Sequence, residues 1–264
     1  MTAAEASSLL GSLGFTLTAA CGAVGRAASQ PLVQRAHHDG SCTGWTPALE
    51  SMCEYFIALL PRLPELRLQL GARTGGHVIV WTDASHSPSF SGLGVVLLDT
   101  ATGKRYEAES PVPQWVFSLL AGAEHSINQL EALALVAARL TFPDVMYGRA
   151  CLHFVDNTSA LSAAVHGYSS KPDMAVITNM LHSVDAALRV DCYYEWVPSV
   201  ANIADIPSRD PRTRTSTCVG IMARLGATRR ALRLPSQAQW RDLTLLLDAR
   251  SAISGAATCP LPAR

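Results

Sequence analysis

The sequence lacks the features that mark membrane, secreted and zinc-binding proteins. No apolar stretch in its 264 residues reaches the roughly 20 residues that a membrane-spanning helix needs, so we expect no membrane partner. The mildly apolar segment SSLLGSLGFTLTAACGAV follows Glu5 and no basic residue, which is not the pattern of a signal peptide. The seven cysteines form no C-x-x-C pair, which favours buried thiols in a reducing compartment over a disulfide framework or a zinc site. We therefore expect an intracellular protein, of the nucleus or the cytoplasm.

The chain also lacks net charge, but its charges are unevenly distributed. Residues 72–210 hold 14 acidic and 8 basic residues, a net of −6, whereas residues 211–264 hold 9 arginines and 2 aspartates, a net of +7. An acidic middle before a basic tail predicts a cation site beside a surface that binds a polyanion. The alternative is a solvated, arginine-rich helical tail that has no nucleic-acid partner.

Hydrophobic periodicity divides the chain into three parts. Residues 1–74 predict helices, because LLGSLGFTLTAACGAV and TPALESMCEYFIALLPRL carry apolar residues at helical spacing. Thr46-Pro47 is a typical helix start. A domain boundary is expected near 71–76, where two successive glycines interrupt the pattern.

Residues 75–212 predict an α/β domain. HVIVWTD and ACLHFVD are apolar on both faces, as central strands are, and GLGVVLLD and RYEAE are joined by a glycine-containing turn. INQLEALALVAARL, with Asn128 as its expected cap, and PDMAVITNMLHSVDAAL each show one apolar helical face, and DCYYEWV is the last strand. This order predicts a mixed five-stranded sheet with helices on its faces.

Residues 213–264 predict a basic, partly helical tail. LPSQAQWRDLTLLLDA has the apolar spacing of one amphipathic helix, with Ser236 as a possible cap.

Four carboxylates lie at the ends of the expected elements. Asp83 and Asp156 each end a buried strand, and neighbouring strands lie about 4.8 Å apart. Glu131 is expected in the first turn of its helix, and Asp205 leaves the last strand through VPSVANIADIPSR. Carboxylates so close repel one another unless a cation lies between them or one holds a proton. Oxygen ligands suit Mg²⁺ or Mn²⁺, and two such ions about 4 Å apart are the usual means of phosphodiester displacement.

Each of these residues also has an ordinary structural interpretation. An aspartate after a strand is common in turns, Asp156-Asn157 is equally typical of a helix cap, and Glu131 could be an exposed helix residue. The four acids in this order, each at the end of an element, are stronger evidence for a site than any one of them alone.

In this order and local setting, the carboxylates resemble those of the type 1 ribonuclease H domain of reverse transcriptases, and most closely of hepadnaviral polymerases and related retroelements. The motifs that carry the resemblance are WTDAS, INQLEAL, FVDNTSAL and WVPSVANIADIPSR, of which the last is the most specific, and they span about residues 77–210. Spacings of 48, 25 and 49 residues between successive acids suit the compact retroelement form. More weakly, residues 1–74 resemble the thumb segment that precedes this domain.

The resemblance implies an endonuclease that cleaves the RNA strand of RNA–DNA hybrids with two Mg²⁺ ions, or with Mn²⁺. Asp83 would bridge both ions, Asp205 would help to hold the ion that activates water, and Glu131 with Asp156 would hold the ion at the leaving 3′ oxygen. Glu131 and the backbone near Ala84 would sense the ribose 2′-hydroxyl. The expected nucleic-acid contacts are Ala84, Asn128, Asn157, Arg224, Arg229, Arg230 and Arg233. Palm and fingers domains of a reverse transcriptase are expected, where there are any, on another chain.

Trp196 departs from the wider family, in which many members have histidine at this position. The hepadnaviral branch also lacks that histidine, so we expect activity to be retained but slow. A catalytically silent binding or connection module is the alternative function, and the presence of all four acids argues against it. A proofreading exonuclease would need Asp-x-Glu on the first strand, where the chain has Asp83-Ala84-Ser85.

Overall fold

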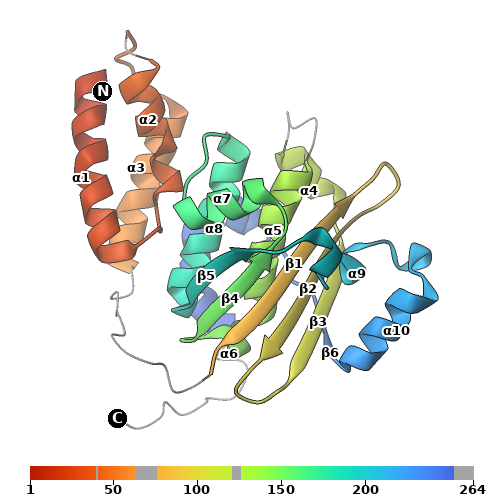
Figure 1. Cartoon of the computed structure of the whole chain (residues 1–264). Helices are drawn as coiled ribbons and strands as arrows, with labels where there is room; N and C mark the ends of the chain where they lie inside the picture. Colours follow the sequence, from red (N-terminus) through yellow and green to blue (C-terminus); the bar gives the residue numbers. More distant parts are fainter. Residues whose placement is uncertain (40, 63–75, 121–125, 253–264) are drawn as a thin grey trace, which may run out of the picture.

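The computed structural model describes residues 1–39, 41–62, 76–120 and 126–252, and its centre is a mixed six-stranded sheet (Figure 1). The strand order is β5-β4-β1-β2-β3-β6. β1, β2 and β3 form an antiparallel meander, whereas β4 pairs with β1, β5 with β4 and β6 with β3 in parallel. The strands are β1 Val78–His86, β2 Ser91–Asp99, β3 Arg105–Pro111, β4 Ala150–Val155, β5 Asp191–Trp196 and β6 Thr228–Ala231. The first five form the ribonuclease H-like arrangement that the sequence predicts.

The sixth strand was not expected. β6 comes from the basic tail and extends the sheet beyond β3, with Tyr106 opposite Thr228 and Glu109 opposite Ala231. The sequence TRRA is short and carries two charges, so it shows no strand-like hydrophobic pattern. Its arginines form ion pairs with acidic residues of the domain. These ion pairs stabilise the strand, and the hydrophobic periodicity of the sequence does not reveal them.

One face of the sheet is covered by a layer of helices. α5 (Ile127–Thr141) and α8 (Pro172–Leu188) form most of this layer, and α7 (Thr158–His166) packs beside them. The short α4 (Gln114–Leu119) and α6 (Pro143–Met146) flank it. Leu130, Leu133 and Ile177 are completely buried in the core between the layer and the sheet. Trp115 and Phe117 of α4 pack against the same core.

The opposite face carries α9 (Asp205–Ser208), a single turn that lies on β1, β2 and β3. Two glycines of β2 make this close approach possible. A Cβ atom at Gly94 would come within 2.5 Å of the Ala204 carbonyl oxygen, and one at Gly92 would collide with the Ser208 carbonyl. The sequence GLG therefore permits the Asp205 segment to lie directly on the strands. α10 (Ser216–Leu225) follows toward the β3 edge (Figure 1).

The N-terminal helices stand beside this domain (Figure 1). They are α1 (Ala3–Cys21), α2 (Gln30–His37) and α3 (Pro47–Leu59), and Thr46 caps α3 as expected. Their core is apolar, but Arg35 is buried in it and donates hydrogen bonds to the carbonyl oxygens of Met1, Cys42 and Gly44. Tyr55 of α3 contacts Asn179 and Ser183 of α8, so the helices pack directly on the α/β domain. The boundary expected near 71–76 falls largely outside the described residues.

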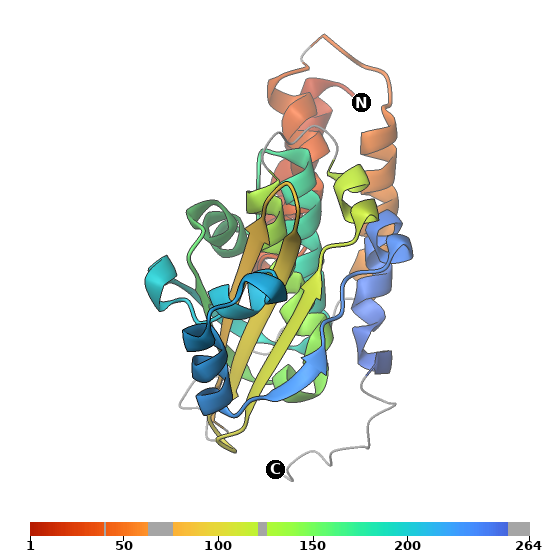
Figure 2. The same cartoon turned by 90° about the vertical axis from the view of Figure 1, so that its right-hand side faces the viewer.

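The last helix is shorter in the structure than the sequence predicts. α11 covers only Gln237–Arg241, with the expected Ser236 cap, and a 3-10 helix follows over Leu243–Ala252. Asp242 interrupts the helix, because its backbone is extended and its carboxylate accepts hydrogen bonds from the backbone and hydroxyl of Thr244. The 3-10 segment packs on α8 and α3 and lies on the same side of the molecule as α3 (Figure 2). In the described part of the chain, no helix has the length and apolarity needed to cross a membrane.

Candidate active site

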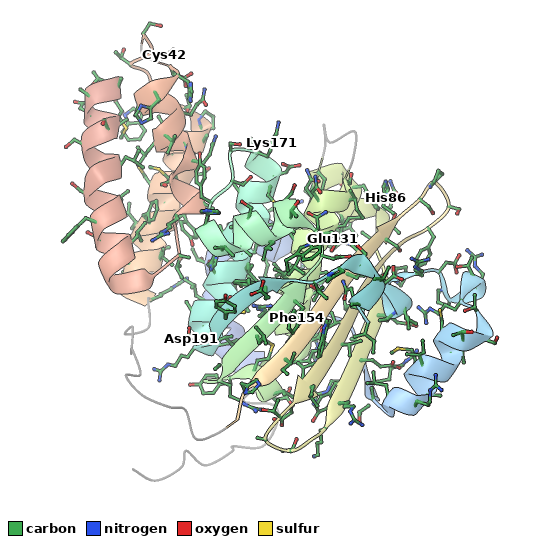
Figure 3. The ribbon with its side chains drawn as sticks, in the orientation of Figure 1. Cys42, His86, Glu131, Phe154, Lys171 and Asp191 are labelled. Atoms are coloured by element: carbon green, nitrogen blue, oxygen red, sulfur yellow. The ribbon has the colours of Figure 1, made fainter. Side chains whose placement is uncertain are left out.

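Three of the four predicted carboxylates converge at one end of the central strands. β1 and β4 pair in parallel with Trp81 opposite Phe154, so Asp83 and Asp156 lie at matching positions two residues further along. Glu131 reaches the same place from α5, at the upper end of the strands in Figure 3. One carboxylate oxygen of each residue lies within 4.8 Å of the others. Asp156 directly follows the last residue of β4, as expected, whereas Asp83 lies inside β1, which continues to His86.

Details of α5 differ from expectation. The sequence predicts Glu131 in the first turn, but the helix begins at Ile127, and Glu131, its fifth residue, lies just beyond that turn. Asn128 does not cap α5: Ser126 is the N-cap residue and makes no side-chain capping bond. Instead, the Asn128 side-chain oxygen accepts a 2.8 Å hydrogen bond from the Asn157 amide. Asn157 caps α7 through Ala160, so the two asparagines link the start of α5 to the end of β4.

Asp83 is buried and held at both oxygens by the segment that contains Asp205. The Ser208 hydroxyl donates to Oδ2 at 2.5 Å, and the Asn202 amide lies 3.5 Å from Oδ1. Asn202 also donates to the Thr82 carbonyl oxygen and accepts from the Ala204 amide, so it both caps the turn and ties it to β1. Asp83 consequently has a fixed orientation.

Two oxygens in the cluster have no protein partner. Oε2 of Glu131 and Oδ1 of Asp156 are buried, and no described residue donates a hydrogen bond to either. A buried acceptor without a donor costs roughly 1–3 kcal/mol, and more when it is charged. The cluster therefore has two buried acceptor oxygens that a bound cation would contact.

Burial and mutual repulsion make the ionised forms of these acids unfavourable. Burial, together with the charges of Asp83 and Asp156, raises the pKa of Glu131 to about 9, although a backbone hydrogen bond at Ala84 works in the opposite direction. Burial also raises the pKa of Asp83 to about 7, with the Ser208 hydrogen bond opposing the shift and the charge of Asp156 adding to it. A divalent cation would reverse this balance, because it favours the ionised form of every ligand.

Asp205 lies apart from the three converging acids. Its side chain is 35% exposed, and its Oδ1 accepts a 2.9 Å hydrogen bond from Nε of Arg209 and lies 2.8 Å from Nη2 in an ion pair. Its charge still contributes to the raised pKa of Asp83. The structure thus brings Asp205 to the edge of the cluster and shows it engaged with an arginine.

Trp196, where the resemblance led us to look for a histidine, is half exposed beside the site. Its indole Nε1 donates a 3.2 Å hydrogen bond to the backbone carbonyl of Asp156. The residue therefore helps to fix the end of β4 and offers no titratable group. His153 lies in β4 and is buried against Thr82, so it does not replace the missing histidine.

The donor set fits magnesium or manganese. All four acids offer oxygen ligands, which Mg²⁺ and Mn²⁺ prefer, and the unpartnered oxygens of Glu131 and Asp156 point to a cation. A second group, Cys151, His153 and Cys192, also has ligand spacing. There, the buried guanidinium of Arg139 already donates to His153 and to the Cys192 sulfur and pairs with Asp185, so a cation fills the position. Only the carboxylate cluster carries a metal-site argument among the described residues.

The expected arginine contacts fall into two groups. Arg229 pairs with Glu107 and Glu109, and Arg230 forms a bidentate pair with Asp144 at 2.6 and 2.9 Å. Both side chains therefore already form ion pairs within the folded domain. Arg224 and Arg233 are exposed, and neither forms an ion pair with any residue in the described part of the chain.

Sequence reasoning missed Ser208, Arg209 and the anchoring role of Trp196. Ser208 and Arg209 were visible as the end of the IADIPSR motif, and their spacing of three and four residues from Asp205 places them one helical turn away. Nothing in the sequence indicates that Ser208 bonds to Asp83, because that contact depends on how α9 lies on the sheet.

Comparisons with known proteins give limited information. No protein-family model matches the chain, and no curated protein matches it in sequence. It is similar in structure to ribonuclease H1 from the halophilic archaeon Halobacterium salinarum NRC-1, with 17% identity and a TM-score of 0.36 over 50% of this chain and 94% of the other. It is also similar to the N-terminal ribonuclease H domain of Rv2228c from Mycobacterium tuberculosis, fused to maltose-binding protein, with 17% identity and a TM-score of 0.29 over 58% of this chain and 99% of the other. At these scores, function has to be argued from the site itself.

Proposed function

We propose that the protein is a divalent-metal-dependent endonuclease that hydrolyses the RNA strand of RNA–DNA hybrids. The observation that carries the proposal is the convergence of Asp83, Glu131 and Asp156, whose oxygens lie within 4.8 Å and include two buried atoms without a donor. Such a cluster is electrostatically unfavourable by itself and becomes favourable with cations bound. Asp205 completes a four-acid set at the edge of the cluster.

The resemblance of the motifs implies a role for each residue. Asp83, between Glu131, Asp156 and the Asp205 segment, would be shared by two ions, with Asp205 on one side and Glu131 and Asp156 on the other. Ions held there supply an activated water and stabilise the leaving 3′ oxygen. Ser208 and Asn202 orient Asp83, and Trp196 fixes the backbone at Asp156.

The substrate class rests on the resemblance of the motifs. Recognition of RNA in a hybrid requires contact with the ribose 2′-hydroxyl, and we assign this to Glu131 and the backbone near Ala84. Asn128 and Asn157, joined by their hydrogen bond, would contact the strands near the site. Arg224 and Arg233 are the tail residues best placed for phosphates, whereas Arg229 and Arg230 would first have to leave their carboxylates.

We also propose that the chain is part of, or descends from, a retroelement reverse transcriptase. The motif WVPSVANIADIPSR supports this relationship, and α1, α2 and α3 would correspond to the thumb segment. Palm and fingers domains on another chain would then be its protein partners.

The direct test is incubation of the purified chain with three labelled substrates: RNA–DNA hybrid, duplex RNA and duplex DNA. We expect cleavage of the RNA strand of the hybrid alone, with Mg²⁺ or Mn²⁺ and not with EDTA. Binding of hybrid without cleavage in either ion would instead support the catalytically silent module. Cleavage of duplex DNA would contradict the proposed substrate class.

A further inference from the structure

We propose that Arg209 is a built-in counter-cation that holds Asp205 while no metal ion is bound, and that it moves to a backbone phosphate of the nucleic acid when an ion takes its place. This inference rests on the proposed function and adds a mechanism by which metal binding and substrate binding favour each other.

The geometry separates Asp205 from the other three acids. Asp83, Glu131 and Asp156 point toward one another, whereas one oxygen of Asp205 accepts a hydrogen bond from Nε of Arg209 and forms an ion pair with its Nη2. The two residues are four apart across the single turn of α9, so the pair is local and needs no other element to form. A positive charge therefore already lies at the fourth acid of the cluster.

Arg209 has a fixed backbone and a free side chain. Its carbonyl oxygen accepts a 2.9 Å hydrogen bond from Arg214, which in turn pairs with Glu109 in a largely buried position. The Arg209 side chain is 60% exposed, and Asp205 is its one ion-pair partner in the described part of the chain. The guanidinium can therefore turn away from Asp205 without disturbing the backbone that positions Ser208.

The pair is weak enough to be exchanged. Ion pairs with this much exposure contribute little, because water and salt screen them. A divalent ion carries twice the charge and can contact several carboxylates at once, so it competes successfully for Asp205. A released guanidinium next to a phosphodiester would bind its oxygens through two parallel hydrogen bonds, the geometry that arginine favours.

The matched control is Arg212. It is also exposed, pairs with an aspartate through the same kind of contact and lies three residues away, but its partner Asp210 is outside the cluster. Arg212→Gln therefore removes the same charge from the same loop. The experiment uses the full chain and titrates Mn²⁺ by calorimetry into the parent, Arg209→Gln and Arg212→Gln without nucleic acid.

We expect Arg209→Gln to bind Mn²⁺ about two- to fivefold more tightly than Arg212→Gln, since a weak competitor has been removed. A second measurement follows the binding of a DNA hybrid with 2′-O-methyl RNA, in Mn²⁺ and increasing salt. Loss of one phosphate contact should reduce the slope of log affinity against log salt by about one in Arg209→Gln only.

The outcomes separate this inference from the proposed function. Equal Mn²⁺ affinity in the two variants would overturn the counter-cation role and leave the nuclease proposal intact. Tighter Mn²⁺ binding with an unchanged salt slope would overturn the move to phosphate. Tighter binding with no cleavage of a normal hybrid by the parent would support the exchange and contradict the nuclease. Failure of the parent to bind Mn²⁺ would overturn both, because the exchange requires an ion.

Discussion

The Ser208 hydroxyl donates a 2.5 Å hydrogen bond to Oδ2 of Asp83, a residue 125 positions earlier in the chain. Ser208 is completely buried, and the same hydroxyl lies 3.1 Å from the Asp205 carbonyl oxygen. One small side chain thus connects the strand that carries the first acid to the helical turn that begins with the last. The Asn202 side chain makes a second connection between the same two segments, through the Thr82 carbonyl oxygen and Asp83, so α9 does not depend on Ser208 alone for its place on the sheet.

Ser208→Ala should therefore weaken metal binding with little effect on the fold. Without the hydroxyl, Asp83 loses the hydrogen bond that opposes the rise of its pKa, so its ionised, metal-binding form becomes less favourable. Loss of a group that orients a metal ligand typically lowers metal affinity about 10- to 100-fold. Calorimetry with Mn²⁺ measures the effect, and the exposed Ser199→Ala is the control. Equal affinity in the two variants would show that Ser208 does not orient Asp83.

The strand pattern made most of the fold predictable. HVIVWTD and ACLHFVD are apolar on both faces because each lies between other strands and under helices, and their last residues then had to lie at the same edge. Asp83 and Asp156 converge because they lie at matching positions on these two parallel strands, whereas the place of Glu131 depends on how α5 packs on the sheet. Hydrophobic periodicity was sufficient to predict these features, because the burial of a strand or helix face requires a periodic pattern of apolar residues.

The features that could not be predicted depend on polar contacts between distant segments. β6 is held by arginines that bind Glu107 and Asp144, so its sequence looks like a charged loop. The helix expected up to residue 249 is interrupted because Asp242 bonds to Thr244, which competes with helical hydrogen bonds. The Asp205–Arg209 pair depends on which way two exposed side chains turn. Polar contacts of this kind leave no periodic pattern of apolar residues in the sequence.

Arg230→Gln should lower stability more than it affects nucleic-acid binding. Arg230 forms a bidentate pair with Asp144, and its guanidinium lies 4.8 Å from the centre of the Tyr106 ring and 5.3 Å from that of Phe142. Losing these contacts should cost about 1 kcal/mol of unfolding free energy, after allowance for partial exposure. Urea denaturation measures the loss, with Arg233→Gln as the exposed control. A larger effect of Arg230→Gln on hybrid binding than on stability would restore its expected role as a phosphate contact.

The stability of the metal-free protein should depend on pH through Glu131 and Asp83. Their pKa values in the folded protein, about 9 and about 7, exceed the ordinary values of 4.5 and 3.8, so the folded state binds more protons than the unfolded state between these limits. Stability from these groups is complete below about pH 4 and is lost as the pH rises toward 9, by at most about 1.4 kcal/mol per pH unit for each proton.

Glu131→Gln tests this dependence, because glutamine has the same shape and does not titrate. In EDTA, urea denaturation from pH 5 to 9 should show a steeper loss of stability in the parent than in the variant. Saturating Mg²⁺ should reduce the difference, since ions favour the ionised acids. Parallel pH profiles in EDTA would mean that Glu131 is not held in an unfavourable ionised state.

Asp156→Asn separates catalysis from binding and folding. Asparagine keeps the shape of the side chain and removes the charge that would hold an ion, so hybrid cleavage should fall by about two orders of magnitude or more. Hybrid binding should be retained, because phosphate contacts lie elsewhere and one negative charge near the substrate is gone. The melting temperature in EDTA should not fall, since repulsion with Asp83 and Glu131 is relieved.

Glu54→Gln, which neutralises an exposed acid on α3, is the control and should match the parent. Cleavage by Asp156→Asn at the parental rate, in a preparation whose parent cuts hybrid, would show that Asp156 is not part of the active site. Loss of cleavage together with loss of the Mn²⁺-dependent rise in melting temperature would place the residue among the metal ligands.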